Sequence, residues 1–369
     1  MIQDIFIIGA TGKVGKMLVK QIFERGDTDA NMHVNPTRVV GLASSNELIY
    51  SPKGLSKHDS INFSEKNNHN TIKYKEFGEF LDIVQHSVRH EKSSLVFVDV
   101  TPANEPMTKF HLKVVEETPY SIVTANKNPI ALSPYSVFKR ITYDVKRYGY
   151  RCSVMAGAHA VPLLQELRDV NDLPLLIQGC FSGTLGYITS ELEKGKKFSD
   201  ILKDAYSKGY TEPHPRDDLN GLDVARKLIV LARTAGFEVD IKDIELEPFI
   251  PDKFFAEDSV DKFMKSVESL DEEFTKKISS ALEKNNTLRY VASMDARNGM
   301  KLRVSLVEVP KQSHFGVLEG TLNKLVVVTK IHPESKPYQL TSQGAGLDVT
   351  AQNIRGDLLY LLPDRKNSV

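Results

Sequence analysis

The sequence has no surplus of charge of either sign and no long apolar run. Its 369 residues carry 48 Lys+Arg and 48 Asp+Glu, so the formal net charge is zero. Proteins that bind nucleic acid through its phosphates usually carry a surplus of positive charge, and we therefore expect no nucleic-acid partner. The longest apolar runs, such as 228–232 and 325–328, are far shorter than the roughly 20 residues that span a bilayer, which predicts no membrane partner.

Cysteine is also scarce. Cys152 and Cys180 are not spaced as metal ligands, and we expect no metal site from them. We interpret them as buried free thiols, with a disulfide between them as the alternative. The N-terminus lacks the basic and apolar regions of a secretory signal, so the sequence predicts a cytoplasmic protein. With 41% hydrophobic and 26% charged residues the composition is that of a globular protein of about two domains.

The chain opens with a strand, a glycine-rich turn and a helix. An apolar strand at 4–8 runs into Gly9-Ala-Thr-Gly-Lys-Val-Gly15, and a helical pattern follows at 17–23. The first glycine permits a tight turn, the second lets the backbone approach a pyrophosphate, and the third lets helix and strand pack closely. The spacing is one residue longer than the usual dinucleotide fingerprint, and a turn that binds nothing is the alternative. The predicted cofactor-binding residues here are Gly9, Thr11, Gly12, Lys13, Val14 and Gly15.

Three more apolar strands end in polar or proline-containing segments. Strand 37–43 ends at Ser44, strand 94–100 at Thr101-Pro102, and strand 120–124 at Ala125-Asn-Lys127. Apolar runs of this kind are typical of parallel strands buried on both faces, and ligands bind beyond the carboxyl ends of such strands. We therefore add Ser44, Thr101, Pro102, Ala125 and Lys127 to the cofactor-binding residues, although a lysine in a solvated loop is the alternative for Lys127.

The choice between NAD and NADP depends on the end of strand 37–43. An NAD site ordinarily has an acid there for the ribose 2′-hydroxyl, and this strand end has Ser44-Ser45 instead. These serines, with Lys53 and Lys57, would suit a 2′-phosphate, so both cofactors are kept as expectations. The polar segment 54–70 is interpreted as an excursion before the next βα unit.

The second half of the chain carries a group of acids and a lysine. The segment 209–233 reads Gly-Tyr-Thr-Glu-Pro-His-Pro-Arg-Asp-Asp-Leu-Asn-Gly-Leu-Asp-Val-Ala-Arg-Lys and continues as an apolar helix. Asp223 and Lys227 are four residues apart on one helical face. The alternative is an ordinary surface ion pair, which would stabilise the helix by only about 0.3–0.5 kcal/mol. A lysine on a buried helix is costly unless it is paired or useful, and such a lysine can exchange protons. The acids Glu212, Asp217, Asp218 and Asp223 suit a ligand with an ammonium group.

These motifs resemble those of the homoserine dehydrogenases. The long segment beginning at Gly209 carries most of the resemblance, and Phe181-Ser-Gly-Thr-Leu-Gly-Tyr, Val123-Thr-Ala-Asn-Lys and Gln343-Gly-Ala-Gly support it in the same order. The Ser-Gly-Thr turn alone suits a small carboxylate, with helix capping as the alternative. The resemblance implies reversible NAD(P)-dependent interconversion of L-homoserine and L-aspartate 4-semialdehyde, on the route to threonine, methionine and isoleucine. Aspartate semialdehyde dehydrogenase and a non-catalytic dinucleotide sensor are the rival hypotheses.

The resemblance also implies roles for individual residues. Lys227 would give a proton to the carbonyl oxygen, Asp223 would be its partner, and Lys127 would be a second family lysine between cofactor and substrate. Glu212 and Asp218 would hold the substrate ammonium, with Gly183, Thr184 and Tyr210 lining its pocket, and Gly346 would join the cofactor-binding residues. A family cation site uses a glutamate, but alignment places Val154 or Arg151 there, so we predict no bound metal.

The expected fold is α/β, with a Rossmann-like doubly wound dinucleotide-binding domain and an α+β catalytic and dimerisation domain. The first would comprise 1–150, completed in the family by a returning segment at about 338–365, and the second 151–337. The family suggests a homodimer. We expect no appended regulatory domain, since such a module would need roughly 80 further residues.

Overall fold

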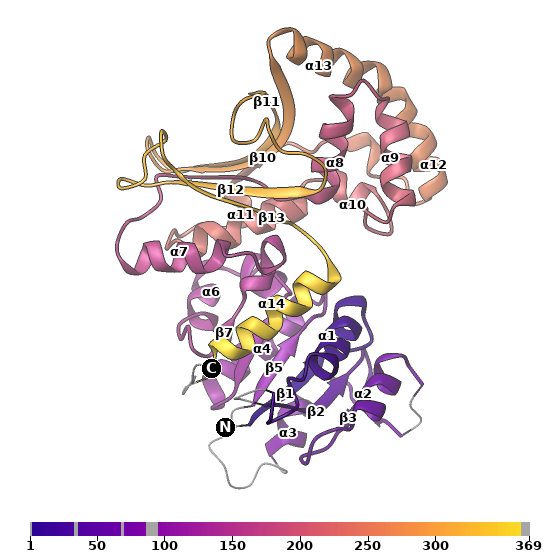
Figure 1. Cartoon of the computed structure of the whole chain (residues 1–369), viewed down its shortest axis with the longest axis vertical. Coiled ribbons are helices and arrows are strands. Elements are labelled where there is room, and N and C mark those ends of the chain that lie inside the picture. The colour runs from indigo at the N-terminus through magenta and orange to yellow at the C-terminus, as the bar shows by residue number, and fades with distance from the viewer. Residues whose placement is uncertain (1, 33–35, 68–69, 86–94, 363–369) are drawn as a thin grey trace. The chain divides into compact units, whose positions relative to one another are not determined.

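The chain folds into two units (Figure 1). The computed structural model describes residues 2–32, 36–67, 70–85 and 95–362. The first unit comprises Met1–Gly157 together with Ala345–Val369, and the second comprises Ala158–Gly344. The returning segment begins later than the expected position near 338, because β13 (Tyr338–Gln343) pairs with β12 (Leu322–Val328) in the sheet of the second unit.

The first unit has a sheet in the order β4-β3-β2-β1-β5-β6-β7. Its parallel strands are β1 (Gln3–Ile8), β2 (Thr37–Ala43), β5 (Val96–Asp99), β6 (Ser121–Thr124) and β7 (Tyr148–Gly149). The antiparallel β3 (Glu47–Tyr50) and β4 (Ile72–Lys73) extend one edge. The strands expected at 4–8, 37–43 and 120–124 are confirmed, and so is the described part of the strand expected at 94–100, whose first residue lies outside the described residues.

The helices of this unit are α1 (Lys13–Glu24), α2 (Lys57–Ser64), α3 (Glu79–Gln85), α4 (Glu105–Glu117), α5 (Asn128–Ala131), α6 (Tyr135–Ile141) and α14 (Leu347–Tyr360), with short 3-10 turns η1 (Arg151–Ser153) and η2 (Met155–Gly157). Helix α2 lies within the segment that we interpreted as an irregular excursion. Its N-terminus is fixed by Ser56, whose hydroxyl accepts a hydrogen bond from Asp59 N at 3.1 Å. This capping serine was the available sequence signal for a helix start.

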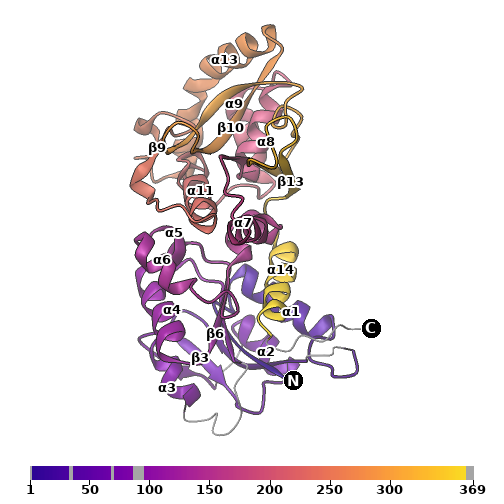
Figure 2. The ribbon, with the colours of Figure 1, turned by 90° about the vertical axis from the view of Figure 1, so that its left-hand side faces the viewer.

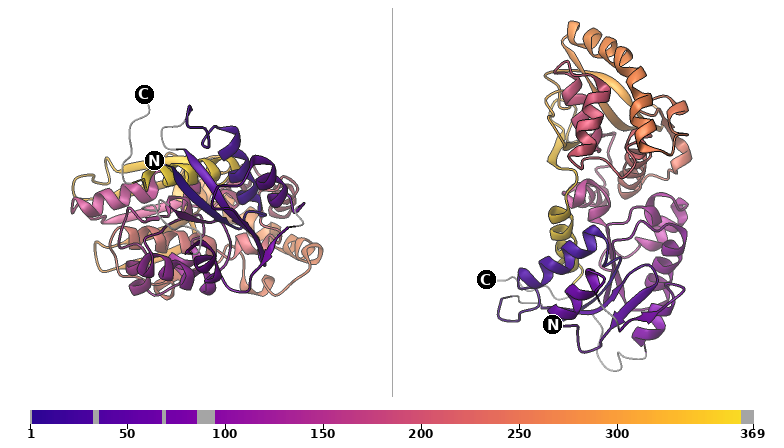
Figure 3. Two further views of the ribbon diagram at one scale, coloured as in Figure 1. Left: turned by 90° about the horizontal axis from the view of Figure 1, so that it is seen from below. Right: turned by 90° about the vertical axis from the view of Figure 1, so that its right-hand side faces the viewer.

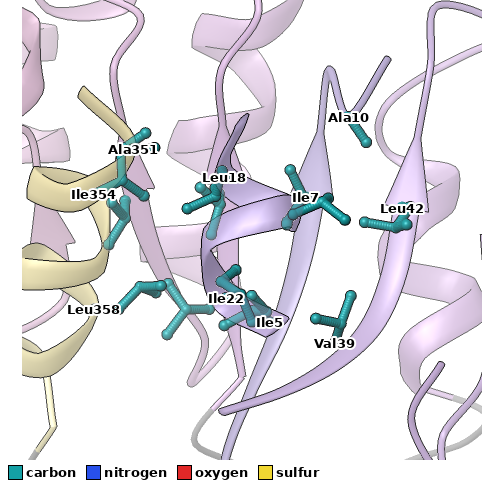
Figure 4. Packing of buried hydrophobic residues seen from close by; sticks show 14 of the residues in the cluster. Ile5, Ile7, Ala10, Leu18, Ile22, Val39, Leu42, Ala351, Ile354 and Leu358 are labelled. Atoms are coloured by element: carbon teal, nitrogen blue, oxygen red, sulfur yellow. The ribbon is translucent and has the colours of Figure 1, made fainter. Parts of the chain in front are cut away.

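The core of the first unit joins segments from both ends of the chain. Ile354 and Leu358 of α14 point toward Leu18 and Ile22 of α1, and all four side chains are buried (Figure 4). Figure 3 (right) shows the yellow α14 alongside the indigo α1. The carboxyl-terminal helix therefore completes the core on which the glycine-rich turn rests.

The second unit has a mostly antiparallel sheet in the order β13-β12-β8-β10-β11-β9. Its remaining strands are β8 (Leu176–Cys180), β9 (Ile244–Leu246), β10 (Asn286–Asp295) and β11 (Lys301–Pro310). Helices α8 (Gly183–Leu192), α11 (Leu222–Thr234) and α13 (Asp271–Glu283) contact β10 (Figure 2). The other helical segments are α7 (Ala160–Asp169), α9 (Phe198–Ser207), α10 (Arg216–Leu219), α12 (Val260–Ser266), and the 3-10 turns η3 (Ile241–Asp243), η4 (Asp252–Phe254) and η5 (Val267–Leu270).

Both units match the expected fold class, since a parallel doubly wound sheet is joined to a mixed α and β unit. Within the described part of the chain, no helix combines the length and the apolar character that crossing a membrane requires.

Truncation of the core side chain of α14 tests whether this helix is integral to the first unit. We expect Ile354→Ala to lower the free energy of unfolding by about 2–5 kcal/mol, because a fully buried side chain leaves a cavity. Chemical denaturation followed by circular dichroism measures the change. The control is Gln352→Ala on the exposed face of the same helix, expected to change it by less than about 0.5 kcal/mol. Equal effects of the two variants would contradict the packing shown in Figure 4.

Candidate active site

The glycine-rich turn of the first unit requires glycine at two positions. Gly9 has φ +90°, and its N–H and that of Ala10 both donate to Ala43 O at 2.9 Å. A Cβ on Gly15 would lie 2.2 Å from Gly9 O, so α1 approaches the turn too closely for any side chain there. Gly12 is exposed, and a Cβ there would meet Gly9 O at 3.3 Å. Its expected role in the approach to a pyrophosphate stays a prediction.

The start of α1 has the chemistry of an anion site. Gly12 is the N-cap and supplies no side-chain hydrogen bond, and the first turn of the helix contains no acid. Lys13 is exposed, while Thr11 and Val14 are half-buried. Backbone N–H groups at a helix N-terminus attract negative charge when no side chain satisfies them. The turn therefore fits the pyrophosphate of a dinucleotide.

Parallel pairing brings four strand ends to one edge of this sheet. The pairs Ile8–Ala43, Ile8–Asp99 and Asp99–Thr124 are in register, so the segments that follow β1, β2, β5 and β6 leave from the same edge. The residues brought to this edge, which we call the cofactor rim, are Gly9, Ser44, Thr101, Pro102, Ala125 and Lys127. Lys127 is half-buried and directly precedes α5.

Two rim residues are held by internal hydrogen bonds. Ser44 Oγ donates to Glu47 O at 3.2 Å, and Ser44 O accepts from Tyr74 Oη at 2.5 Å. Thr101 donates to Asp99 Oδ1 through its N at 2.9 Å and its Oγ1 at 2.7 Å. Elsewhere in the unit, Gly346 has φ +144° and is the N-cap of α14.

The structure does not place Lys53 beside Ser44. The segment that carries it returns along β2, where Ser51 N donates to Val40 O at 2.8 Å and Leu55 N donates to Val39 O at 2.7 Å. These carbonyls belong to the middle of β2, whereas Ser44 follows its last residue. Lys57 comes two residues after Leu55, at the first residue of α2. The suggested contribution of Lys53 to a 2′-phosphate site is therefore corrected, and that of Lys57 stays a prediction.

In the second unit, Lys227 is held between a carboxylate and a carbonyl. Its Nζ lies 2.8 Å from Asp223 Oδ2 and donates to Phe181 O at 2.6 Å. The Lys227 side chain is 12% exposed and that of Asp223 is 42% exposed. Just before the helix, whose N-cap is Gly221, Asn220 Oδ1 accepts a hydrogen bond from Leu222 N at 2.8 Å. The pair is thus formed at the edge of a helix whose other face is buried.

Asp218 contacts other residues of the predicted substrate pocket. Its Oδ1 lies 2.8 Å from Thr184 Oγ1, and its Oδ2 accepts from Glu212 N at 2.8 Å. Thr184 Oγ1 also lies 2.6 Å from Tyr210 O. Burial raises the pKa of the Asp218 carboxyl to about 6; the two hydrogen bonds lower this pKa, and the charges of Glu212 and Asp223 raise it.

The remaining predicted substrate residues surround this carboxylate. Gly183 is the first residue of α8, and Ser182 caps that helix by accepting from Leu185 N at 3.2 Å. The half-exposed ring of Tyr210 packs edge-on against Tyr187, with ring centroids 5.2 Å apart. Asp217 lies apart from this group, because its carboxylate faces Arg216 at 3.9 Å.

Each unit therefore carries a distinct chemical capacity. The first offers backbone N–H groups and a lysine at the cofactor rim. The second offers an ammonium proton donor, Lys227, and carboxylates at Asp218, Glu212 and Asp223 that suit a cationic amine. Sequence reasoning missed the carbonyl of Phe181 and the carboxylate of Asp99. A backbone carbonyl such as that of Phe181 leaves no signal in the sequence. The acid at the end of the apolar strand Val96–Asp99, by contrast, was a visible signal.

Comparison with known proteins supplies a family. Residues 162–359 match the family model of homoserine dehydrogenase. The bifunctional aspartokinase/homoserine dehydrogenase of Haemophilus influenzae is 33% identical over 97% of this chain, which covers 43% of that protein. The first relatives of this bifunctional kind are all longer, and the chain spans about two fifths of their length. The homoserine dehydrogenase of Saccharomyces cerevisiae is 31% identical over 76% of this chain and 78% of its own.

Solved structures show the same fold. A Candida auris protein of unknown function has a TM-score of 0.83 and 28% identity, with 98% of each chain covered. A hyperthermophilic archaeal homoserine dehydrogenase in complex with NADPH has a TM-score of 0.69 over 99% of this chain and 100% of its own. At 20% identity, this second likeness concerns the fold alone.

The raised pKa of Asp218 predicts a pH-dependent stability. Because its folded-state pKa lies near 6, above the ordinary 3.8, the protonated carboxyl favours folding and this contribution is lost as pH rises through 6. We expect the stability of Asp218→Asn, relative to the unchanged protein, to increase between pH 4.5 and pH 7. Urea unfolding of both proteins at several pH values measures this. A pH-independent difference would contradict the raised pKa.

Proposed function

Because the chain belongs to the homoserine dehydrogenase family, we propose that it catalyses the reversible NAD(P)-dependent reduction of L-aspartate 4-semialdehyde to L-homoserine. The observation that carries this proposal is the Lys227 ammonium, which is held by Asp223 and Phe181 O. The charge of the same Asp223 also acts on the carboxyl group of Asp218. An ammonium donor next to acids that can hold a second ammonium suits a zwitterionic amino acid whose side chain ends in a carbonyl.

Lys227 acts on the carbonyl oxygen. When bound, the reduced nicotinamide supplies a hydride to the carbonyl carbon. The oxygen then gains negative charge, which Lys227 stabilises before its Nζ–H proton moves to that oxygen. Asp223 and Phe181 O hold two of the three N–H groups, and this leaves the third for the substrate. In the oxidative direction the neutral amine takes the hydroxyl proton back.

The acids around Asp218 hold the substrate amine. An ionised Asp218, with Glu212 beside it, would pair with the α-ammonium, and Thr184 Oγ1 and Glu212 N fix the orientation of the carboxylate. Fixing the far end of the substrate in this way places its carbonyl rather than activating it. Gly183 leaves room for the substrate because it has no side chain.

The first unit would hold the cofactor. The turn Gly9–Gly15 would receive the pyrophosphate, Thr101 and Pro102 would lie on the nicotinamide side, and Lys127 would act as the second lysine near the substrate. The archaeal structural neighbour is a complex with NADPH, and Ser44 at the end of β2 is compatible with either NADP or NAD. Gly346 is retained as part of the same proposal.

The rival aspartate semialdehyde dehydrogenase needs a nucleophilic thiolate. Burial raises the pKa of Cys180 to about 12, and burial also raises the pKa of Cys152 well above its ordinary value. Neither thiol supplies a nucleophile at neutral pH. The geometry therefore favours proton donation by Lys227 over cysteine chemistry.

A homodimer and a reducing, cytoplasmic location remain part of the proposal. The family resemblance supports the dimer, which sedimentation analysis at several concentrations would test. The free, buried state of both cysteines is compatible with a reducing compartment.

The activity itself is tested with homoserine and each cofactor. We expect the absorbance of reduced nicotinamide to rise when homoserine is added to the protein with NADP or NAD, and to fall when aspartate semialdehyde is added with the reduced cofactor. Aspartate and serine are the control substrates. Aspartate has a carboxylate at C4 in place of an alcohol or aldehyde, and serine lacks C4. No homoserine-dependent change with either cofactor would overturn the proposal.

Replacing the proton donor separates chemistry from binding. We expect Lys227→Met to lower kcat by about 10²–10⁴-fold, with cofactor affinity unchanged, since the proton donor is lost while the apolar stem is kept. Lys276→Met is the matched control, because Lys276 also pairs with an acid four residues earlier, at 2.5 Å from Glu272, on the exposed face of α13 in the same unit. Loss of cofactor affinity in Lys227→Met would show that Lys227 has another role.

The substrate carboxylate predicts a pH profile. Because Asp218 is protonated below a pKa of about 6, we expect KM for homoserine to rise as pH falls below 6. In Asp218→Asn, KM should be higher at pH 7, and the rise of KM below pH 6, which we call the acidic limb, should be absent. Steady-state kinetics between pH 5 and pH 8 measure both effects, and an unchanged acidic limb in the variant would assign it to another group.

A further inference from the structure

Three titratable side chains form a buried cluster in the first unit. Asp99 is the last residue of β5, His111 lies in α4 and Tyr148 in β7, and their exposed fractions are 0%, 0% and 1%. His111 Nδ1 lies 2.8 Å from Tyr148 Oη, and His111 Nε2 lies 3.3 Å from Asp99 Oδ2. Among the described residues, Nε2 has no hydrogen-bond partner, although the Asp99 carboxylate lies close to it. The proposed chemistry uses none of these three groups.

The other side of the Asp99 carboxylate faces the first loop of the cofactor rim. Asp99 Oδ1 accepts both hydrogen bonds from Thr101, and Thr101 Oγ1 in turn accepts from Ala103 N at 3.2 Å. Oδ2 also lies 3.3 Å from Oγ1 of the buried Thr124, at the end of β6. One carboxylate thus contacts the ends of two neighbouring strands.

Two asparagines connect the first loop to the second. Asn126 Nδ2 donates to Ala103 O at 2.7 Å, and Asn126 Oδ1 accepts from Asn128 N at 3.0 Å. Asn128 Nδ2 donates to Pro102 O at 2.9 Å. Thr124 Oγ1 accepts from Asn126 N at 2.9 Å. Lys127 lies between these asparagines, so its backbone is fixed by the same network.

We propose that Asp99 and His111 are positioning residues for the cofactor rim, which fix the loops 101–103 and 125–128 and thereby the places of Thr101 and Lys127. The inference rests on the proposed function, because it gives these loops a cofactor to meet. The His111 ring lies beside Oδ2 on the helix side, while Oδ1 accepts both hydrogen bonds of Thr101. Tyr148 fixes the ring of His111 through Nδ1.

Fold stability alone does not account for this cluster. Removing a carboxylate from water is costly, and apolar side chains of similar volume often stabilise a core at least as well. Here the carboxylate contacts Thr101, Thr124 and one imidazole, and two of its hydrogen bonds come from Thr101, which we expect to meet the cofactor. Residues that orient a binding group from behind typically change affinity without touching the ligand.

The test removes the imidazole and measures loop order and cofactor affinity. In His111→Leu we expect the dissociation constant of NADPH, measured by its fluorescence, to rise about tenfold. In the ligand-free protein, hydrogen exchange of the Thr101, Ala103 and Asn128 amides should become faster. His111→Gln, which keeps a polar group beside Asp99, should restore most of both. KM for homoserine at saturating cofactor should stay unchanged while kcat falls.

The matched control is Thr118→Val at the other end of α4. Thr118 is also buried, and its Oγ1 donates to Val114 O at 2.7 Å, so the variant loses a buried hydrogen bond far along the same helix. It should lower the melting temperature without changing NADPH affinity or exchange of the rim loops. A His111→Leu protein that matches this control, with only a lower melting temperature, would overturn the inference.

The two proposals fail separately. If the unchanged protein shows no homoserine-dependent reaction while NADPH affinity and loop exchange respond to His111→Leu, the proposed reaction is wrong and the positioning role stands. If the unchanged protein is active and the His111 variants bind NADPH as it does, the positioning role is wrong and the proposed reaction stands.

Discussion

The second unit depends on the need to compensate a single ammonium group on a largely buried helix. Helix α11 presents an apolar face to its surroundings, and Lys227 stands at the edge of that face with only part of its side chain in water. Asp223 provides the opposite charge one turn earlier, and the end of β8 provides the carbonyl of Phe181. The Lys227 side chain thus links α11 to the residue that follows β8. The close turn at Gly221, where a Cβ would lie 2.1 Å from Tyr290 Oη, allows the helix to begin there.

The first unit also contains a buried polar side chain, Asp99, whose surroundings must compensate for its removal from water. The carboxyl group of Asp99 has no exposure to water, and it contacts hydroxyl, amide and imidazole groups of the loop 101–103, β6 and α4. In both units a buried polar group constrains its surroundings, because each compensating group must stay within hydrogen-bond distance. The exposed surface pairs, such as Lys276 with Glu272, impose no comparable order on the fold.

Much of the architecture could be predicted from local patterns. The strand, glycine turn and helix at the start of the chain are encoded within a few residues, as is the pairing of Asp223 with Lys227 on one helical face. The helix at Lys57–Ser64 was missed because its apolar residues show no clear helical period. The capping residue Ser56 was the sequence signal for its start. The network joining Asp99, His111 and Asn126 could not be predicted. Its members lie far apart in sequence, and their contacts exist only once the strand order is known. The position of Lys53 was misjudged for the same reason, since the return of β3 along β2 reverses the direction of the chain.

The packing of α14 against α1 also bears on the order in which the protein forms during synthesis. The second unit is continuous from Ala158 to Gly344, so all of its residues leave the ribosome before α14 is made. The first unit begins earlier but lacks Ile354 and Leu358 until α14 has been made, which leaves Leu18 and Ile22 without their partners in the meantime. Domains that are continuous in sequence can fold as soon as they emerge. The glycine-rich turn, although it is made before the second unit, therefore rests on a core that is completed after that unit.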